Sequence, residues 1–180
     1  MHEFLLTPTL SISFQRYPYP PAGFVTTLPT SWGALPLIAD APGHLVLPCP
    51  DTEAFWIGLI PEETGKSTVV RVLASVASGD RIDVVTGARL DRSATTGAAD
   101  ITVPRAYGVV GISRGDGTWW PFARDAAGEP DTECRGLDLF SAPGASVRVD
   151  LVGSAEFEEL AGIRLPPLDP ADRYGGWRLP

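Results

Sequence analysis

The sequence predicts an all-β protein: a single-domain β-sandwich with one short helix near its C-terminus. Of the 180 residues, 19 are Gly and 18 are Pro, and neither residue suits the interior of a helix. Hydrophobic residues make up 44% of the chain, which is enough for a core. Short alternating runs separated by turn residues favour a sandwich or a barrel over an α/β fold. We favour the sandwich, with a jelly roll as its candidate topology.

Residues 1–60 are expected to form a proline-rich, apolar wrapping segment. Half of the 18 prolines fall here, so strands in this part should be short or lie at sheet edges. Apolar residues alternate with polar ones in residues 10–14, as in a half-buried strand. Two further apolar runs, bounded by prolines, predict strands over residues 44–47 and 54–60.

Residues 61–153 are expected to form a strand-rich body. Its clearest strand covers residues 67–76, where apolar residues occupy alternate positions, and the turn at Gly79 predicts a hairpin with the next strand. A second hairpin is predicted over residues 107–122, and a further strand over residues 145–152. At this length a single domain, residues 1–180, is the default expectation.

Residues 154–180 are expected to form a short helix followed by a tail that docks on the body. Ser154 is a good N-cap and Gly162 a good helix end. The apolar stripe of this helix is expected to be buried and comprises Phe157, Leu160 and Ile163. The aromatic residues Tyr174 and Trp177 predict docking of the tail.

The charge balance bounds the partners. The chain has 14 basic and 22 acidic residues, a net charge of −8, so nucleic acid and anionic membranes are disfavoured. We find neither a signal peptide nor an apolar run long enough to span a membrane. A cytoplasmic location is therefore the default expectation, with signal-independent export left open. Cys49 and Cys134 form no C-x-x-C motif, and the sequence leaves open whether they pair in a disulfide or stay free.

Three catalytic-looking motifs fail on context. Residues 111–115 match the G-x-S-x-G nucleophile elbow, but both histidines precede Ser113 and no helix is expected to follow it. Residues 64–68 end like a phosphate loop, yet the required upstream glycine is misplaced. His44 and Cys49 would meet only if the chain folded back between them, so a thiol enzyme is disfavoured.

The tryptophans offer the most useful functional signal. Trp119 and Trp120 are neighbours in an expected strand, so their side chains should point to opposite faces, and Phe55 and Trp56 pose the same problem. An outward tryptophan is either covered by the wrapping segment or the tail, or belongs to an interface or a sugar-stacking platform.

We therefore favour a non-enzymatic interaction protein that binds a protein partner or a second copy of itself. The candidate binding residues are Trp119, Trp120, Trp56, Arg114 and Asp116. The alternative is a carbohydrate-binding module assisted by calcium, although the absence of Asn removes a common sugar ligand. The carboxylates that suit a calcium ion are Asp125, Glu129, Asp131 and Glu133. A third hypothesis is a small acid–base enzyme that uses Asp80 and Asp83. No cofactor other than calcium is expected.

Overall fold

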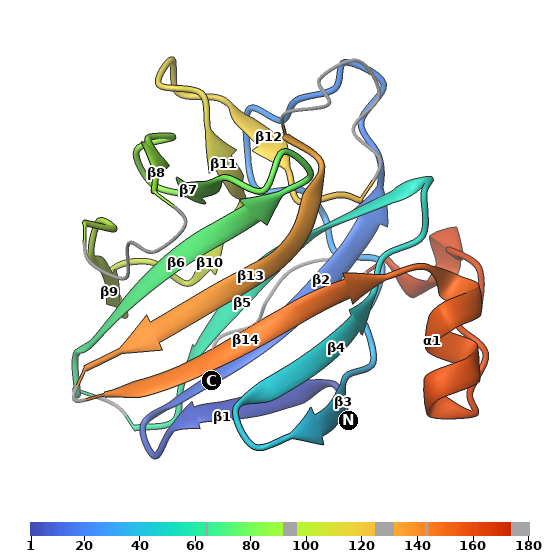
Figure 1. Ribbon diagram of the computed structural model, residues 1–180, viewed down its shortest axis with the longest axis horizontal. Helices are drawn as coiled ribbons and strands as arrows, with labels where there is room; N and C mark the ends of the chain where they lie inside the picture. Colours follow the sequence, from blue (N-terminus) through green and yellow to red (C-terminus); the bar gives the residue numbers. More distant parts are fainter. Residues whose placement is uncertain (64, 92–96, 125–131, 143, 174–180) are drawn as a thin grey trace.

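The computed structural model describes residues 1–63, 65–91, 97–124, 132–142 and 144–173 (Figure 1). These residues form mainly β-strands, with one α-helix among them near the C-terminal end. The prediction of a β-sandwich with one short helix is confirmed.

The larger sheet contains eight strands. In spatial order they are β3 (Ile38–Ala41), β4 (His44–Pro48), β14 (Ala145–Val152), β13 (Cys134–Ser141), β6 (Thr68–Val76), β7 (Arg81–Asp83) and β8 (Arg89–Leu90), and β9 (Ile101–Val103) pairs with β6. Strands β4 and β14 run parallel, and His44 lies opposite Arg148 in their register. A jelly roll is antiparallel, so this parallel pair departs from that candidate topology.

The smaller sheet packs behind the larger one, as Figure 1 shows. Its strands are β1 (Glu3–Thr7), β2 (Leu10–Pro18), β5 (Glu53–Pro61) and β10 (Gly108–Val109), all antiparallel to their neighbours. A separate two-stranded hairpin is formed by β11 (Gly111–Ser113) and β12 (Trp119–Pro121). The main core lies between the two sheets and draws buried apolar side chains from both.

The alternation seen in the sequence places side chains in this core. Phe14 of β2 packs against Phe55 of β5, with ring centroids 5.7 Å apart, and Phe55 stacks on Phe122 at 5.5 Å. From the larger sheet, Val70 and Val72 of β6 are fully buried in the same core. The predicted strand over 67–76 and the turn that follows it are confirmed.

Strand β2 is buried on both faces, whereas the sequence predicted a half-buried strand. Its Gln15 side chain faces Ser31, and residues 32–35 pair with the edge of β2 through backbone hydrogen bonds. Ser31 donates a hydrogen bond to Gln15 at 2.7 Å, and the Leu35 amide donates to the Phe14 carbonyl at 2.8 Å. The expectation that strands in residues 1–60 are short or lie at sheet edges is wrong, because β2 and β5 are nine residues long and lie inside the small sheet. Only residues 19–35, called the proline-rich segment from here on, lie against that sheet.

The predicted second hairpin is divided between two sheets. Val109 pairs with Ile57 of β5, whereas Gly111 pairs with Pro121 of β12. The hairpin around the Arg114–Gly117 turn is confirmed, but the strand before it changes partner between Val109 and Gly111.

Helix α1 (Ser154–Ala161) forms where the sequence predicted a helix, but its details differ. Gly153, not Ser154, occupies the N-cap position, and Gly162 ends the helix with φ of 67° as expected. Phe157 is fully buried against Val46 and Val152. The other expected members of the stripe are exposed, Leu160 by 59% and Ile163 by 51%. Ala161 also packs on this cluster, partly buried, but Leu160 and Ile163 do not, so the predicted stripe is too wide.

The tail is fastened to the body as far as residue 173. Arg16 donates a hydrogen bond to the Pro166 carbonyl at 2.9 Å, and the Arg173 guanidinium lies 4.8 Å from the centre of the Trp32 ring. Tyr174 and Trp177 lie outside the described residues. Within the part of the chain that is described, no helix has the length and hydrophobicity needed to cross a bilayer.

Candidate functional site

Trp56 lies under cover and presents no surface to a partner. Its side chain is 2% exposed, although it points to the opposite face of β5 from the core residue Phe55. Partly buried Val25 and Trp32 of the proline-rich segment pack on the cluster that contains it. For this tryptophan, intramolecular cover is the outcome, because the segment that precedes β3 lies over the outer face of β5.

Trp119 and Trp120 are both half-buried. Trp120 packs against the main core, and the Arg114 guanidinium lies between its ring, at 5.3 Å, and that of Phe24, at 4.6 Å. Trp119 exchanges two backbone hydrogen bonds with Val25, each 2.9 Å long. The β11–β12 hairpin is thus joined to the proline-rich segment, and its two tryptophans share the boundary between core and solvent.

Trp119 also lines an open cleft of about 470 Å³, named here the Trp119 cleft. Its lining comprises Val84, Val85, Asp100, Ile101, Thr102, Arg105, Ala106, Gly108, Val109, Val110, Gly111, Ser113 and Trp119. These residues come from β9, β10, β11 and β12, from the connections next to β9 and β10, and from the chain after β7, on the side of the molecule away from α1 (Figure 1). A Cβ atom at Gly111 would lie 2.1 Å from the Trp120 carbonyl oxygen, so the hairpin needs glycine there.

Large apolar side chains are exposed around this cleft. Val85 and Tyr107 are each 41% exposed, and Leu28 is 50% exposed. The Leu28 Cδ1 atom lies 3.5 Å from where a Cβ atom of Gly108 would be, on the face of β10 that meets Trp56, and Tyr107 directly precedes this lining glycine. We call these three residues the apolar rim.

Two charged residues line the cleft. Asp100 forms an ion pair with Arg71, whose Nε atom lies 2.6 Å from the Asp100 carboxylate. Arg105 is exposed, and among the described residues no acidic side chain pairs with it. The lining therefore carries one compensated negative charge and one uncompensated positive charge.

Arg114 and Asp116, the other candidate binding residues, shape the tip of the β11–β12 hairpin. The Asp116 carboxylate accepts hydrogen bonds from the Thr118 hydroxyl and from the Thr118 amide, the latter at 2.9 Å. Both hydrogen bonds lower the pKa of Asp116, and the bond from the Thr118 hydroxyl has the larger effect. Both residues thus have local structural roles: Asp116 in the turn and Arg114 between two aromatic rings.

Of the four candidate calcium ligands, the structure describes Glu133 alone. Asp125, Glu129 and Asp131 lie outside the described residues, and Glu133 pairs with Arg135 at 2.7 Å. Among the residues that are described, no three His, Cys, Asp or Glu side chains gather as a metal site would require.

The proposed acid pair has separate partners. Asp83 is buried and accepts hydrogen bonds from the amides of Val85, at 3.0 Å, and Ala99, at 3.1 Å. Asp80 is bonded instead by Arg89, whose Nη1 atom lies 2.6 Å away. The Asp83 carboxylate thereby holds two loops next to the Trp119 cleft.

Cys49 and Cys134 are free, fully buried thiols. Burial raises the pKa of each to about 12. A thiol that remains protonated at neutral pH is a poor nucleophile, which adds to the case against a thiol enzyme. His44 is not near a thiol partner but is bonded by Asp40 and Asp150, as a structural histidine would be.

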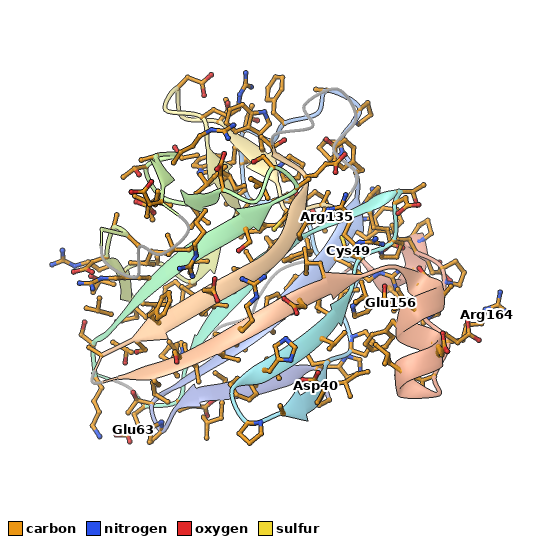
Figure 2. All side chains as sticks on the ribbon, in the orientation of Figure 1. Asp40, Cys49, Glu63, Arg135, Glu156 and Arg164 are labelled. Carbon is orange, nitrogen blue, oxygen red and sulfur yellow. The ribbon has the colours of Figure 1, made fainter. Side chains whose placement is uncertain are left out.

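A line of charged side chains on the outer face of the larger sheet escaped the sequence analysis. His44 lies 2.6 Å from the Asp40 carboxylate on edge strand β3 and 2.9 Å from that of Asp150; Figure 2 labels Asp40. Arg148 joins Asp150, at 2.7 Å, to Asp138, at 2.9 Å, and Arg81 completes the series by pairing with Asp138. We call these six residues the charge ladder. Outward-facing polar positions were visible in each strand, but the parallel pairing of β4 with β14 was not.

Comparisons with protein-family models, with curated proteins and with solved structures find no match to this chain.

Proposed function

We propose that this chain is a non-enzymatic protein-interaction domain and that its contact surface is the Trp119 cleft with its apolar rim. The supporting observation is that exposed Val85 lines a cleft that also contains Trp119, while exposed Tyr107 and Leu28 lie next to the lining residue Gly108. Contiguous apolar patches on a protein surface mark interaction sites, and aromatic residues are enriched there. The rim supplies Tyr107 and the cleft supplies Trp119.

The alternatives have less support. A sugar platform needs an open aromatic face; Arg114 lies over the Trp120 ring and Trp56 is buried, so among the candidate tryptophans half-buried Trp119 is left for this role. An acid–base enzyme needs two carboxylates acting on one group, and Asp80 and Asp83 each serve a different neighbour. A protein partner would contact the exposed features of this surface, namely the apolar rim, the Trp119 cleft and the charge of Arg105 beside it.

The proposal is tested by a photo-cross-linking amino acid placed at Tyr107, with the same amino acid at Leu160 as the matched control. Leu160 is apolar and more exposed than Tyr107, but it lies on α1, on the other side of the molecule (Figure 1). We expect a discrete cross-linked species from position 107 and none from position 160. If the partner is a second copy of this chain, the purified protein gives a cross-linked dimer. If the partner is another protein, the cross-linked species forms only in a lysate of the native cells, and its mass exceeds that of the chain alone.

Introducing a negative charge into the apolar rim provides the second measurement. In the protein that carries the cross-linker at position 107, Val85→Glu and Leu28→Glu should each abolish the cross-linked species, because a carboxylate in an apolar contact must be desolvated. Both side chains are exposed, so the unfolding midpoint should change little. Equal cross-linking from positions 107 and 160, or a species that survives both substitutions, would contradict the proposed surface.

A further inference from the structure

We infer that the partner presents a carboxylate next to a bulky apolar side chain: Arg105 pairs with the carboxylate while the apolar side chain enters the Trp119 cleft. This inference rests on the proposed function and adds the chemistry that the partner must carry. It draws on the charge of the lining and on the character of the cleft interior.

The positive charge of the Trp119 cleft comes from Arg105. Arg105 lines the cleft and is exposed, and within the described ranges it has no acidic partner. Arg71, Arg81 and Arg148 are each neutralised by an aspartate. In a protein with a net charge of −8, an uncompensated cation at the edge of an apolar cleft gives that edge a local sign opposite to the rest of the molecule.

An acidic residue, Asp100, lies in the same cleft lining as Arg105 and would repel an incoming carboxylate. However, the Arg71 guanidinium lies 2.6 Å from the Asp100 carboxylate and offsets its charge. Asp83, next to the cleft, is buried and accepts hydrogen bonds from the Val85 and Ala99 amides. The exposed charges of Arg71, Asp100 and Arg105 sum to one positive charge, so a carboxylate is the complementary group.

The interior of the Trp119 cleft is apolar. Val84, Ile101 and Val109 line the cleft as buried apolar residues, and half-buried Trp119 also lines it. The cleft, of about 470 Å³, lies within the range of roughly 300–1,000 Å³ that is typical of ligand pockets, so it can accept a bulky side chain. Gly108 and Gly111 add no side chains to its wall. The apolar interior of the cleft and the positive charge at its edge together define an occupant that is apolar at one end and anionic at the other.

The experiment uses a small fragment with these two features. 3-Phenylpropionate is titrated into the full-length, isotope-labelled protein, and its neutral counterpart 3-phenylpropanamide serves as the matched probe. We expect shifts of the Trp119 indole and of the Gly108 and Gly111 amides with both probes. The carboxylate should bind about two- to fivefold more tightly, the range measured for exposed ion pairs.

Two variants assign the preference to Arg105. Arg105→Gln should bind acid and amide equally. Arg164→Gln should keep the preference, because Arg164 is an exposed arginine beside α1 at the far side of the molecule (Figure 2). Equal binding of both probes by the unmodified protein, a preference that survives Arg105→Gln, or shifts located away from the cleft would each overturn the inference.

Cross-linking from Tyr107 separates this inference from the proposed function. If Arg105→Gln leaves the cross-linked species at full yield, the interaction surface stands and the carboxylate inference fails. If position 107 yields no species, the proposed function fails, and the protein-borne carboxylate fails with it, whatever the small fragment does. A species whose yield falls with Arg105→Gln and not with Arg164→Gln supports both.

Discussion

The buried ion pair between Arg16 and Glu53 shows how single residues join distant parts of the chain. Both side chains are buried, with Arg16 Nε 2.8 Å from the Glu53 carboxylate. Arg16 also donates a hydrogen bond to the Pro166 carbonyl. A buried pair of this kind contributes little net stability, but removing one partner would leave an uncompensated charge. One residue of β2 thereby links the small sheet to the C-terminal tail.

His44 makes the stability of the protein depend on pH. The hydrogen bond to Asp150 comes first among the causes that raise the pKa of His44 above its ordinary value, and the bond to Asp40 acts in the same direction. A raised folded-state pKa means that this contribution to stability is fully present below the unfolded-state pKa, about 6.5. It is lost as the pH rises through the folded-state pKa.

We therefore expect His44→Gln to lower the free energy of unfolding by about 1 kcal/mol or less at mildly acidic pH, and by less at alkaline pH. Denaturant unfolding of both proteins across this range measures the difference. The remaining histidine, His2, is common to both proteins and cancels in the comparison. A difference that is constant with pH, or that grows as the pH rises, would show that the charged form of His44 is not the stabilising one.

At the scale of elements, α1 is held to the sheet through one buried side chain. Phe157 packs in a cluster with Val46 of β4 and Val152 of β14, whereas Leu160 faces solvent. The periodicity of a helix shows which residues share a face, but the width of the buried stripe depends on how much of the neighbouring sheet the helix covers.

This contrast predicts very different costs for two truncations in the same helix. Phe157→Ala should lower the free energy of unfolding by about 3–5 kcal/mol, because it leaves a cavity between α1 and the sheet. Leu160→Ala should change it by less than about 0.5 kcal/mol, since its side chain is already in water. Equilibrium denaturation of both variants measures this. Similar costs for the two would place Leu160 in a contact that the fold does not show.

At the scale of the whole molecule, the two sheets share one core. Side chains from β2 and β5 meet those from β6, β13 and β14 in a single cluster, and the proline-rich segment packs on the outer side of the small sheet. No sheet can therefore lose its partner without exposing the apolar face of both.

We expect cooperative unfolding in a single transition. The midpoint from tryptophan fluorescence, to which buried Trp56 contributes, should coincide with that from far-ultraviolet circular dichroism. Coincident transitions would support the single-domain expectation. Two separated transitions would mean that the proline-rich segment or the tail comes away before the sheets do.

Local pattern was enough to predict most strands, the two turns at Gly79 and at Arg114–Gly117, and the position of the helix. These features depend on period-two alternation and on turn residues, which are written in neighbouring positions. The candidate residue Trp119 was also identifiable, because adjacent tryptophans in a strand cannot both enter one core.

Tertiary structure alone decided which strands pair and what covers them. The parallel register of β4 and β14 brings His44 opposite Arg148, and the switch between Val109 and Gly111 opens the cleft beside Trp119. The proline-rich segment buries Trp56 and leaves Tyr107 exposed. Pairing and cover join residues that lie far apart along the chain, so they follow from the free energy of the assembled core and have no signature in local sequence.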